Sequence, residues 1–313
     1  MTFSSMDYFV MIARERSFTK AAEQLHITQQ SLSAHIAALE QELGCQLLVR
    51  HVPLELTYAG KVFLNYALTF QQNLNSMRQE FCDITNNQKG TLRIGIAFTR
   101  GRTIMPDLIA AFQKEFPNIA IELNEDTNEA LHKNLLNGET DLAIANFPDT
   151  LQGAELKDFY HEEIVLLLSS QLLQQVYGNQ ADQVVNTASK GNLSPLQNCP
   201  FVMGDSADIA PHIGLAAIHR SNFRPIIKVK SDNMETLLAL CVRGVGGCFC
   251  PENLARAVLT PAQLSQLHVI RLGNRAKYPI RFGYLKQSYQ WSILSEFIRI
   301  AKEHTIVIRK SLV

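Results

Sequence analysis

A long stretch without helix breakers constrains this chain more than any other feature of its 313 residues. Between Gly60 and Gly90 the sequence contains no Pro or Gly, and apolar residues recur at alternating steps of four and three. These residues are Phe63, Ala67, Phe70, Leu74, Met77, Phe81 and Ile84. A repeat of this period predicts a helix with one apolar edge, as in a coiled coil. About 28 helical residues at ~1.5 Å each form a rod of roughly 42 Å.

We predict that this rod, residues 59–89, pairs two subunits. The predicted dimerisation residues are Phe63, Phe70, Leu74, Met77 and Phe81. The alternative is a long helix lying on its own domain, which the strict spacing favours less. The segment "NNQKG" at 86–90 ends the helix and marks the clearest domain boundary in the chain.

The residues before this rod predict three short helices. Apolar residues recur at helical spacing over 4–15, Ser17 is a suitable N-cap for "FTKAAEQL", and Thr28 is one for a helix that Gly44 ends. The small Ala21 and Ala22 allow the second helix to approach the third closely. This arrangement is typical of a helix-turn-helix.

The third helix begins with uncharged hydrogen-bonding residues, in the stretch "HITQQSLS". The start of the later helix of a helix-turn-helix enters the DNA major groove, where Gln pairs with adenine and Ser bonds several bases. A solvated helix end capped by Thr28 is the alternative. We therefore predict these DNA-binding residues: Thr28, Gln29, Gln30, Ser33, His35 and Arg50.

Two short extended segments, 46–50 and 54–57, follow around Pro53 and predict a hairpin, the wing of a winged helix-turn-helix. The run "SFTKAAEQLHITQQSLSAHIAALEQELGCQLLVR…LTYAG" resembles the DNA-binding domain of LysR-type transcriptional regulators. The chain departs from that family at Gln30, where Pro is usual, at Ala34, and in a wing that offers only Arg50 and His51. Residues 1–60 hold four basic and six acidic residues, a balance of −2. Because phosphate contacts carry much of DNA affinity, we expect one copy to bind weakly and several to act together.

The remaining two-thirds alternate strands with helices, which predicts parallel α/β sheets. Order and spacing resemble the two-lobed, periplasmic-binding-protein-like (type II) effector domain of the same family. The predicted fold is thus α/β with an all-α N-terminal region. The predicted domains are a winged helix-turn-helix at 1–58, a linker helix at 59–89, lobe I at 90–160 plus 270–313, and lobe II at 161–269.

Ligands of open α/β sheets bind beyond the carboxyl ends of strands. The loop Phe98–Thr103 lies between a strand and a helix, where free N–H groups favour an anion. The resemblance implies that Thr99 touches an effector carboxylate, and Arg100 or Arg102 could pair with the anion, although a solvated loop is the alternative for both. Asp205 and Ser206 would suit an amine. The predicted effector-binding residues are Thr99, Arg100, Thr103, Thr127, Asn146, Met203, Asp205 and Ser206.

Other functions find less support in the sequence. The chain has no G-x-S-x-G, H-E-x-x-H, Walker A or paired C-x-x-C motif, and its nine histidines are dispersed, so we expect no enzyme, no cofactor and no metal. Cys199, Cys241, Cys248 and Cys250 all fall in the predicted lobe II. We interpret them as packed core residues, with a reactive Cys199 in a thiol-based redox sensor as the alternative.

The overall charge balance points to neither a nucleic acid nor a membrane as partner. Lys plus Arg and Asp plus Glu both number 29, no apolar run approaches a membrane span, and no signal peptide is evident, so we expect a cytoplasmic protein. We predict a LysR-type transcriptional regulator that forms a homodimer or homotetramer. It binds double-stranded operator DNA and responds to a small polar, carboxylate-bearing effector. A small-molecule-binding protein without DNA function is the alternative from another class.

Overall fold

The protein is described from a computed structural model covering residues 2–51, 53–85, 89–204, 208–287 and 289–311, the side chains of 305–311 excepted. The chain forms two compact units. The first comprises Met1–Gly90 with Gln287–Ser292, and the second comprises Thr91–Lys286 with Ile293–Val313. The finer division into four parts predicted from the sequence stays a prediction.

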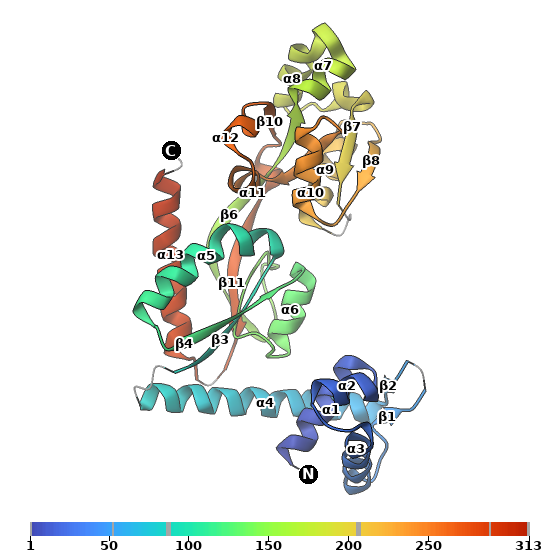
Figure 1. Cartoon of the computed structure of the whole chain (residues 1–313), viewed down its shortest axis with the longest axis vertical. Helices are drawn as coiled ribbons and strands as arrows, with labels where there is room; N and C mark the ends of the chain where they lie inside the picture. The colour runs from blue at the N-terminus through green and yellow to red at the C-terminus, as the bar shows by residue number, and fades with distance from the viewer. Residues whose placement is uncertain (1, 52, 86–88, 205–207, 288, 312–313) are drawn as a thin grey trace. The chain divides into compact units, whose positions relative to one another are not determined.

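Three helices and a short hairpin open the first unit (Figure 1). They are α1 (Phe3–Glu15), α2 (Phe18–Gln24), α3 (Gln29–Leu43), β1 (Leu48–Val49) and β2 (Glu55–Leu56). The predicted caps are confirmed: Ser17 accepts from Lys20 N, Thr28 accepts from Ser31 N, and Gly44 ends α3 with φ of 67°. The strands are shorter than predicted, since only Leu48–Leu56 and Val49–Glu55 pair across the hairpin.

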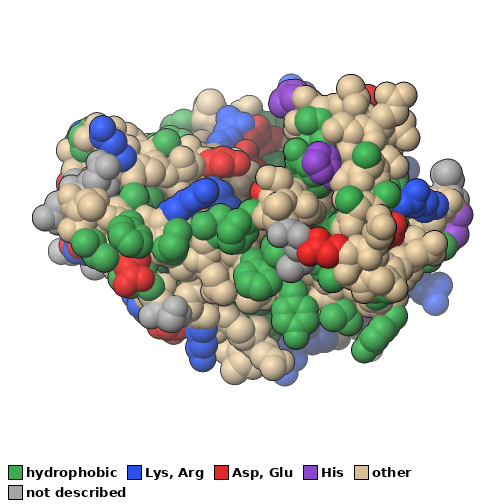
Figure 2. Space-filling model, turned by 90° about the horizontal axis from the view of Figure 1, so that it is seen from below, with side chains coloured by type: hydrophobic (Ala, Val, Ile, Leu, Met, Phe, Trp, Pro, Cys, Tyr) green, Lys and Arg blue, Asp and Glu red, His purple; other side chains and the backbone are tan. Residues whose placement is uncertain are grey.

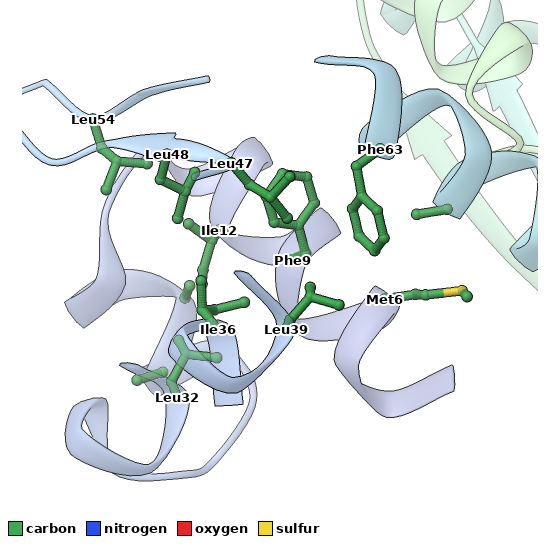
Figure 3. Close-up of a cluster of buried hydrophobic side chains, with 13 residues drawn as sticks. Met6, Phe9, Ile12, Leu32, Ile36, Leu39, Leu47, Leu48, Leu54 and Phe63 are labelled. Atoms are coloured by element: carbon green, nitrogen blue, oxygen red, sulfur yellow. The ribbon is translucent and has the colours of Figure 1, made fainter. Parts of the chain in front are cut away.

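One apolar cluster holds these elements together (Figure 3). Leu32, Ile36 and Leu39 from α3 are buried against Phe9 of α1. Phe63 of the next helix joins the cluster, with its ring edge-on to Phe9 at 5.0 Å between centroids. The helices on either side of the turn of the helix-turn-helix are therefore held together by a shared apolar core.

The long helix predicted within residues 59–89 is confirmed as α4 (Tyr58–Ile84), which ends five residues before position 89. The residues of its predicted apolar edge fall into a buried group and an exposed group. Phe63 and Ala67 are buried in the core of the first unit, whereas Phe70, Met77 and Phe81 are exposed by 42%, 48% and 59%. Exposed hydrophobic side chains gather on the face of the molecule shown in Figure 2.

The second unit is a mixed sheet flanked by helices (Figure 1). Its strands are β3 (Gly90–Ile96), β4 (Ile119–Glu125), β5 (Leu142–Ala145), β6 (Ala154–Ser169), β7 (Pro200–Met203), β8 (Ile226–Lys230), β9 (Gly247–Pro251), β10 (Leu267–Arg271) and β11 (Lys277–Leu285). Its helices are α5 (Phe98–Glu115), α6 (Asn128–Leu136), α7 (Ser170–Tyr177), α8 (Ala181–Ser189), α9 (Ile209–Arg220), α10 (Met234–Val242), α11 (Glu252–Val258), α12 (Pro261–Leu264) and α13 (Ser292–Ser311).

The strand order β4-β3-β5-β11-β6-β9-β7-β8, with β10 also paired to β6, defines two lobes. We call the part built on β4, β3, β5 and β11 lobe I, and the part built on β9, β7, β8 and β10 lobe II. The strand β6 belongs to both: Ala154–Glu163 pairs with β11, and Ile164 begins the pairing with β9. The predicted α/β class and its two lobes are confirmed, but the predicted parallel arrangement is only partly right. The strand β6 runs antiparallel to β9, β10 and β11, and β11 runs antiparallel to β5.

Two predicted boundaries are wrong. The helix α5 begins at Phe98 rather than near Thr103, because β3 passes directly into it through the extended residue Ala97, and Pro106 lies inside the helix. The apolar run "EEIVLLLSS" predicts a strand beginning at Glu162, but β6 begins eight residues earlier, at Ala154, because its first half pairs with β11. The sequence reading also missed α7, α8, α11, α12 and β10.

Candidate DNA-binding surface and effector site

The first turns of α3 present polar side chains on the side opposite the core. Gln29 and Gln30 are exposed and Ser33 is half-buried, whereas Leu32 is fully buried (Figure 3). The Thr28 hydroxyl accepts from Ser31 N at 3.2 Å and so fixes the start of the helix. The predicted residues therefore gather at one helix end, with the polar groups of the glutamines directed to solvent.

The two remaining predicted DNA-binding residues have protein contacts. The exposed His35 lies edge-on to Tyr8, with 5.1 Å between ring centroids. Arg50, directly after β1, donates through Nη2 to Glu40 Oε2 at 3.0 Å, and 51% of its side chain is exposed. Its guanidinium can therefore reach a phosphate while it remains paired.

The candidate effector site lies where β3, β4 and β5 of lobe I end. Thr99 is in the first turn of α5, and its hydroxyl has no hydrogen-bond partner among the described residues. Thr127 caps α6, since its hydroxyl accepts from Ala130 N at 3.3 Å. Asn146 follows β5 and donates through Nδ2 to Pro279 O at 2.9 Å. Lobe I thus brings three of the predicted residues to one edge of its sheet.

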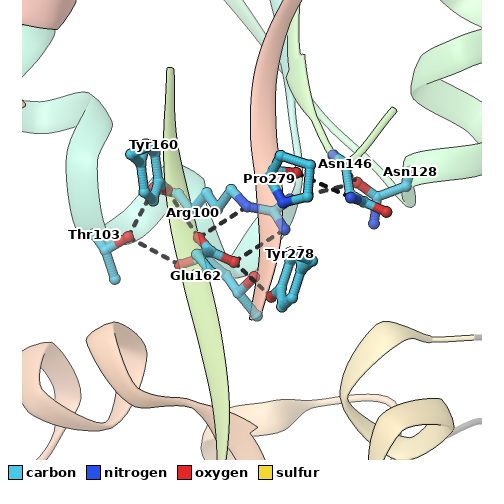
Figure 4. A network of polar contacts seen from close by, with 9 residues as sticks. Arg100, Thr103, Asn128, Asn146, Tyr160, Glu162, Tyr278 and Pro279 are labelled. Atoms are coloured by element: carbon cyan, nitrogen blue, oxygen red, sulfur yellow. Dashed lines mark hydrogen bonds and ion pairs between the residues drawn. The ribbon is translucent and has the colours of Figure 1, made fainter. Parts of the chain in front are cut away.

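Arg100 instead lies in a buried network (Figure 4). Its Nε and Nη2 donate to the two carboxylate oxygens of Glu162 at 3.0 and 3.1 Å. The hydroxyls of Tyr160 and Tyr278 donate to the same carboxylate at 2.8 and 2.6 Å. The remaining Nη1 donates to Asn128 Oδ1 at 3.4 Å, and that oxygen also accepts from Asn146 N at 3.0 Å.

Burial and the neighbouring groups shift the pKa of Arg100 in opposite directions. Burial lowers the pKa of Arg100, but the interactions with Glu162, Tyr278 and Tyr160 together outweigh burial and raise that pKa above its ordinary value. Burial, followed by the same carboxylate, raises the pKa of both Tyr160 and Tyr278. The guanidinium of Arg100 therefore stays charged, and two of its nitrogens are committed to the Glu162 carboxyl group. The prediction that Arg100 binds an effector stays a prediction.

The other predicted effector residues are placed differently. The Thr103 hydroxyl donates back to Arg100 O at 3.1 Å within α5. Met203 ends β7 in lobe II and is 3% exposed. Asp205 and Ser206 lie outside the described residues. Sequence reasoning missed Glu162, Tyr160 and Tyr278, because no local signal marks partners that meet α5 only through the pairing of β6 with β11.

A second arginine of α5 makes a contact between the lobes. Arg102 donates to Glu235, which lies in the first turn of α10 in lobe II. Both side chains are partly exposed, at 56% and 41%. The pair joins the N-terminal ends of two helices, one from each lobe.

The four lobe II cysteines are buried free thiols. Burial raises the pKa of Cys199 and of Cys241 to about 12 each. Burial also raises the pKa of Cys248 and Cys250, which lie on β9. A thiol that reacts with peroxide does so as the thiolate, so this state of the protein offers none of the four as a ready nucleophile.

The described residues contain neither a candidate metal centre nor a candidate membrane-spanning helix. No group of three or more His, Cys, Asp or Glu is placed to hold a metal ion in the described part of the chain. Within that same part, none of the helices has the length and apolar character needed to span a membrane.

Family models match both units. "Bacterial regulatory helix-turn-helix protein, lysR family" matches residues 3–61, and "LysR substrate binding domain" matches residues 85–306. The chain therefore belongs to the LysR family of DNA-binding transcriptional regulators, with an N-terminal helix-turn-helix and an effector-binding domain.

Individual relatives agree with this assignment. The chain is 30% identical over 261 residues to the nitrogen assimilation regulatory protein nac of Escherichia coli, covering 82% of this chain and 81% of that protein. It is 26% identical over 311 residues to the uncharacterized HTH-type transcriptional regulator YcgK of Bacillus subtilis, covering 97% and 94%. The fold is similar to full-length OxyR C199D from Pseudomonas aeruginosa, with a TM-score of 0.68, 20% identity and coverage of 96% and 94%. CbnR in complex with its target DNA has a TM-score of 0.60, 23% identity and coverage of 97% and 99%.

Proposed function

We propose that the first turns of α3 read base edges of an operator while Arg50 of the wing contacts phosphate. The observation that carries this proposal is the exposure of Gln29 and Gln30 at the start of a helix whose other face is fully buried. Gln pairs with adenine through both the oxygen and the NH2 of its side-chain amide, and Ser donates to or accepts from several bases. The match to the helix-turn-helix model over residues 3–61 supports the same assignment.

A binding assay on two kinds of duplex tests the base-reading proposal. We expect Gln29→Ala or Ser33→Ala to reduce the ratio of operator to random-sequence affinity by about tenfold, because each removes a base contact worth ~1–3 kcal/mol. The operator is first selected from a random duplex pool with the unaltered chain. Equal loss on both duplexes would contradict the proposal, and failure to select any sequence would favour a small-molecule-binding protein without DNA function.

We further propose that a small polar effector bearing a carboxylate binds at the end of lobe I and controls DNA binding. Arg100 and Arg102 are both paired with carboxylates of the protein, so the anion is expected to meet Thr99 and the N–H groups of the first turn of α5. Because no side chain caps this helix, the dipole and the Thr99 hydroxyl are available to a ligand.

A thermal-shift screen of organic acids and amino acids tests the effector proposal. A compound that binds only the folded chain raises its Tm by mass action. We expect a carboxylate-bearing compound to raise the Tm of the reduced protein and Thr99→Val to abolish that rise. The control Thr187→Val removes a hydroxyl of α8 whose one hydrogen bond to a described residue is to Gln183 O, and it should respond like the unaltered chain. An unchanged response of Thr99→Val would contradict the proposed role of Thr99.

The same screen with peroxide addresses the redox alternative. The fold is similar to OxyR, but Cys199 is buried and its raised pKa keeps the thiol protonated. We therefore expect no peroxide-induced shift that dithiothreitol reverses. Such a shift, together with no carboxylate hit, would favour a thiol sensor over an effector sensor.

A further inference from the structure

The wing of this protein is too short to hold its own orientation. Its strands β1 and β2 contain two residues each. An isolated two-stranded hairpin is at best marginally stable in water, so the direction of its side chains must be fixed from outside. The contacts of the residues just before the wing show how this is done.

Glu40 of α3 holds the first wing strand from one side. Its Oε1 accepts from the backbone N–H of Leu47 at 2.8 Å and of Leu48 at 3.2 Å. The side chain is 11% exposed, so these bonds are shielded from water. A residue of α3, the helix proposed to read bases and called the recognition helix below, therefore hydrogen-bonds directly to the backbone of the wing.

Residues at the start of α4 also contact the backbone of residues 46–47. Thr57 donates through its hydroxyl to Gln46 O at 2.8 Å and through its backbone N to Leu47 O at 3.0 Å. Gly60 lies so close to this backbone that a Cβ at its position would be 2.0 Å from Leu47 O. The segment 46–48 is thus fixed between two helices.

The second oxygen of Glu40 carries the contact that bears on DNA. Glu40 Oε2 accepts from Arg50 Nη2 at 3.0 Å, while the guanidinium carbon lies 5.9 Å from the centroid of the Phe18 ring at the start of α2. An arginine held from two sides loses less side-chain entropy when it meets a phosphate. Its other N–H groups stay available, because no further acceptor for them is found among the described residues.

We infer that Glu40 is a positioning residue for DNA binding, which aligns the wing and aims Arg50 from the recognition helix. This inference rests on the proposed phosphate contact of Arg50. It assigns a favourable role to an acidic side chain next to DNA, although its charge alone would repel the phosphates.

Anisotropy titrations of the full chain against a labelled random-sequence duplex, at several salt concentrations, test the inference. Glu40→Gln keeps an amide oxygen for the backbone N–H groups and removes the charge that pairs with Arg50. The control Glu42→Gln removes the same charge from the same helix. We expect Glu40→Gln to bind about three- to tenfold more weakly than Glu42→Gln. We also expect no such difference when both are made in an Arg50→Ala background, because the guanidinium to be aimed is then absent.

The outcomes separate this inference from the proposal beneath it. If Arg50→Ala leaves the affinity and salt slope unchanged instead of lowering the slope by about 1, the phosphate contact itself is wrong. If Arg50→Ala weakens binding but Glu40→Gln binds as well as Glu42→Gln or better, only the positioning role is overturned. Should Glu40→Gln fail to fold, Arg50→Lys decides. It keeps the charge but loses the forked geometry, so weaker binding supports positioning and equal binding overturns it.

Discussion

Two adjacent carboxylates illustrate how position within one strand decides the role of a residue. Glu162 and Glu163 follow each other on β6 at the point where the strand passes between the lobes. Because side chains alternate along a strand, they face opposite sides. Glu162 is buried against Arg100 of lobe I, whereas Glu163 accepts from Arg271, at the end of β10, at 3.0 Å near solvent. The strand β6 is therefore paired with Arg100 on one face and with Arg271 on the other.

The buried and exposed pairs should differ in their effect on stability. We expect Glu162→Gln to lower the free energy of unfolding by about 3 kcal/mol or more, because it leaves a buried guanidinium without its counter-charge. We expect Glu163→Gln to lower it by at most about 1 kcal/mol, because 55% of the Arg271 side chain is exposed to solvent. Urea unfolding followed by circular dichroism measures both. Equal effects would mean that the Arg100 network does not stabilise the crossing.

The helix α4 shows how a single element serves two environments. Its sequence carries one apolar edge, yet Phe63 and Ala67 complete the core of the first unit, and the exposed residues of that edge begin at Phe70. At its far end Asp83 accepts from the backbone N and the hydroxyl of Ser292 at 2.9 and 2.7 Å. A second copy of the chain is therefore predicted to pack on the exposed part, which includes Met77 and Phe81.

A charge on the exposed edge tests this pairing. We expect Phe81→Glu to weaken self-association at least about tenfold, because it buries a charge in an apolar contact, without changing Tm much. Asn65→Glu adds the same charge at another exposed position of α4 and should leave association unchanged. Sedimentation equilibrium across a concentration range gives both constants. An unaltered constant for Phe81→Glu would place the contact between copies elsewhere.

At the scale of the whole molecule, regulation requires that effector binding change something the DNA-binding unit can sense. A ligand shifts an equilibrium only by as much as its affinity differs between two states. The chain passes between the two units at Gly90–Thr91, Lys286–Gln287 and Ser292–Ile293. Within the second unit, the exposed Arg102–Glu235 pair joins the lobes beside the candidate effector site, whereas the Arg100–Glu162 pair is buried at the crossing. The exposed pair is the contact that solvent and ligands can reach.

Local patterns in the sequence determined the elements of this protein and its family. The spacing of apolar residues and the caps Ser17, Thr28 and Gly44 specify the three short helices, because capping and amphipathic periodicity act within a few residues. The uninterrupted stretch after Gly60 specified α4 in the same way. The polar start of α3 could be placed on the surface, since Leu32 and Ile36 fix which face turns inward.

Only the tertiary structure decided which of the predicted site residues are available to bind a ligand or a partner. Arg100 meets Glu162 across 62 residues and Arg102 meets Glu235 across 133, so no local pattern could show that both arginines are paired. Phe63 was predicted to lie in the dimer contact, but its side chain packs against Phe9 of α1 in the core of the first unit. Glu40 reaches the wing because the chain turns back after the end of α3 and brings the backbone N–H of Leu47 to its carboxylate. Hydrogen bonds and burial depend on neighbours in space, and the sequence order alone does not contain those neighbours.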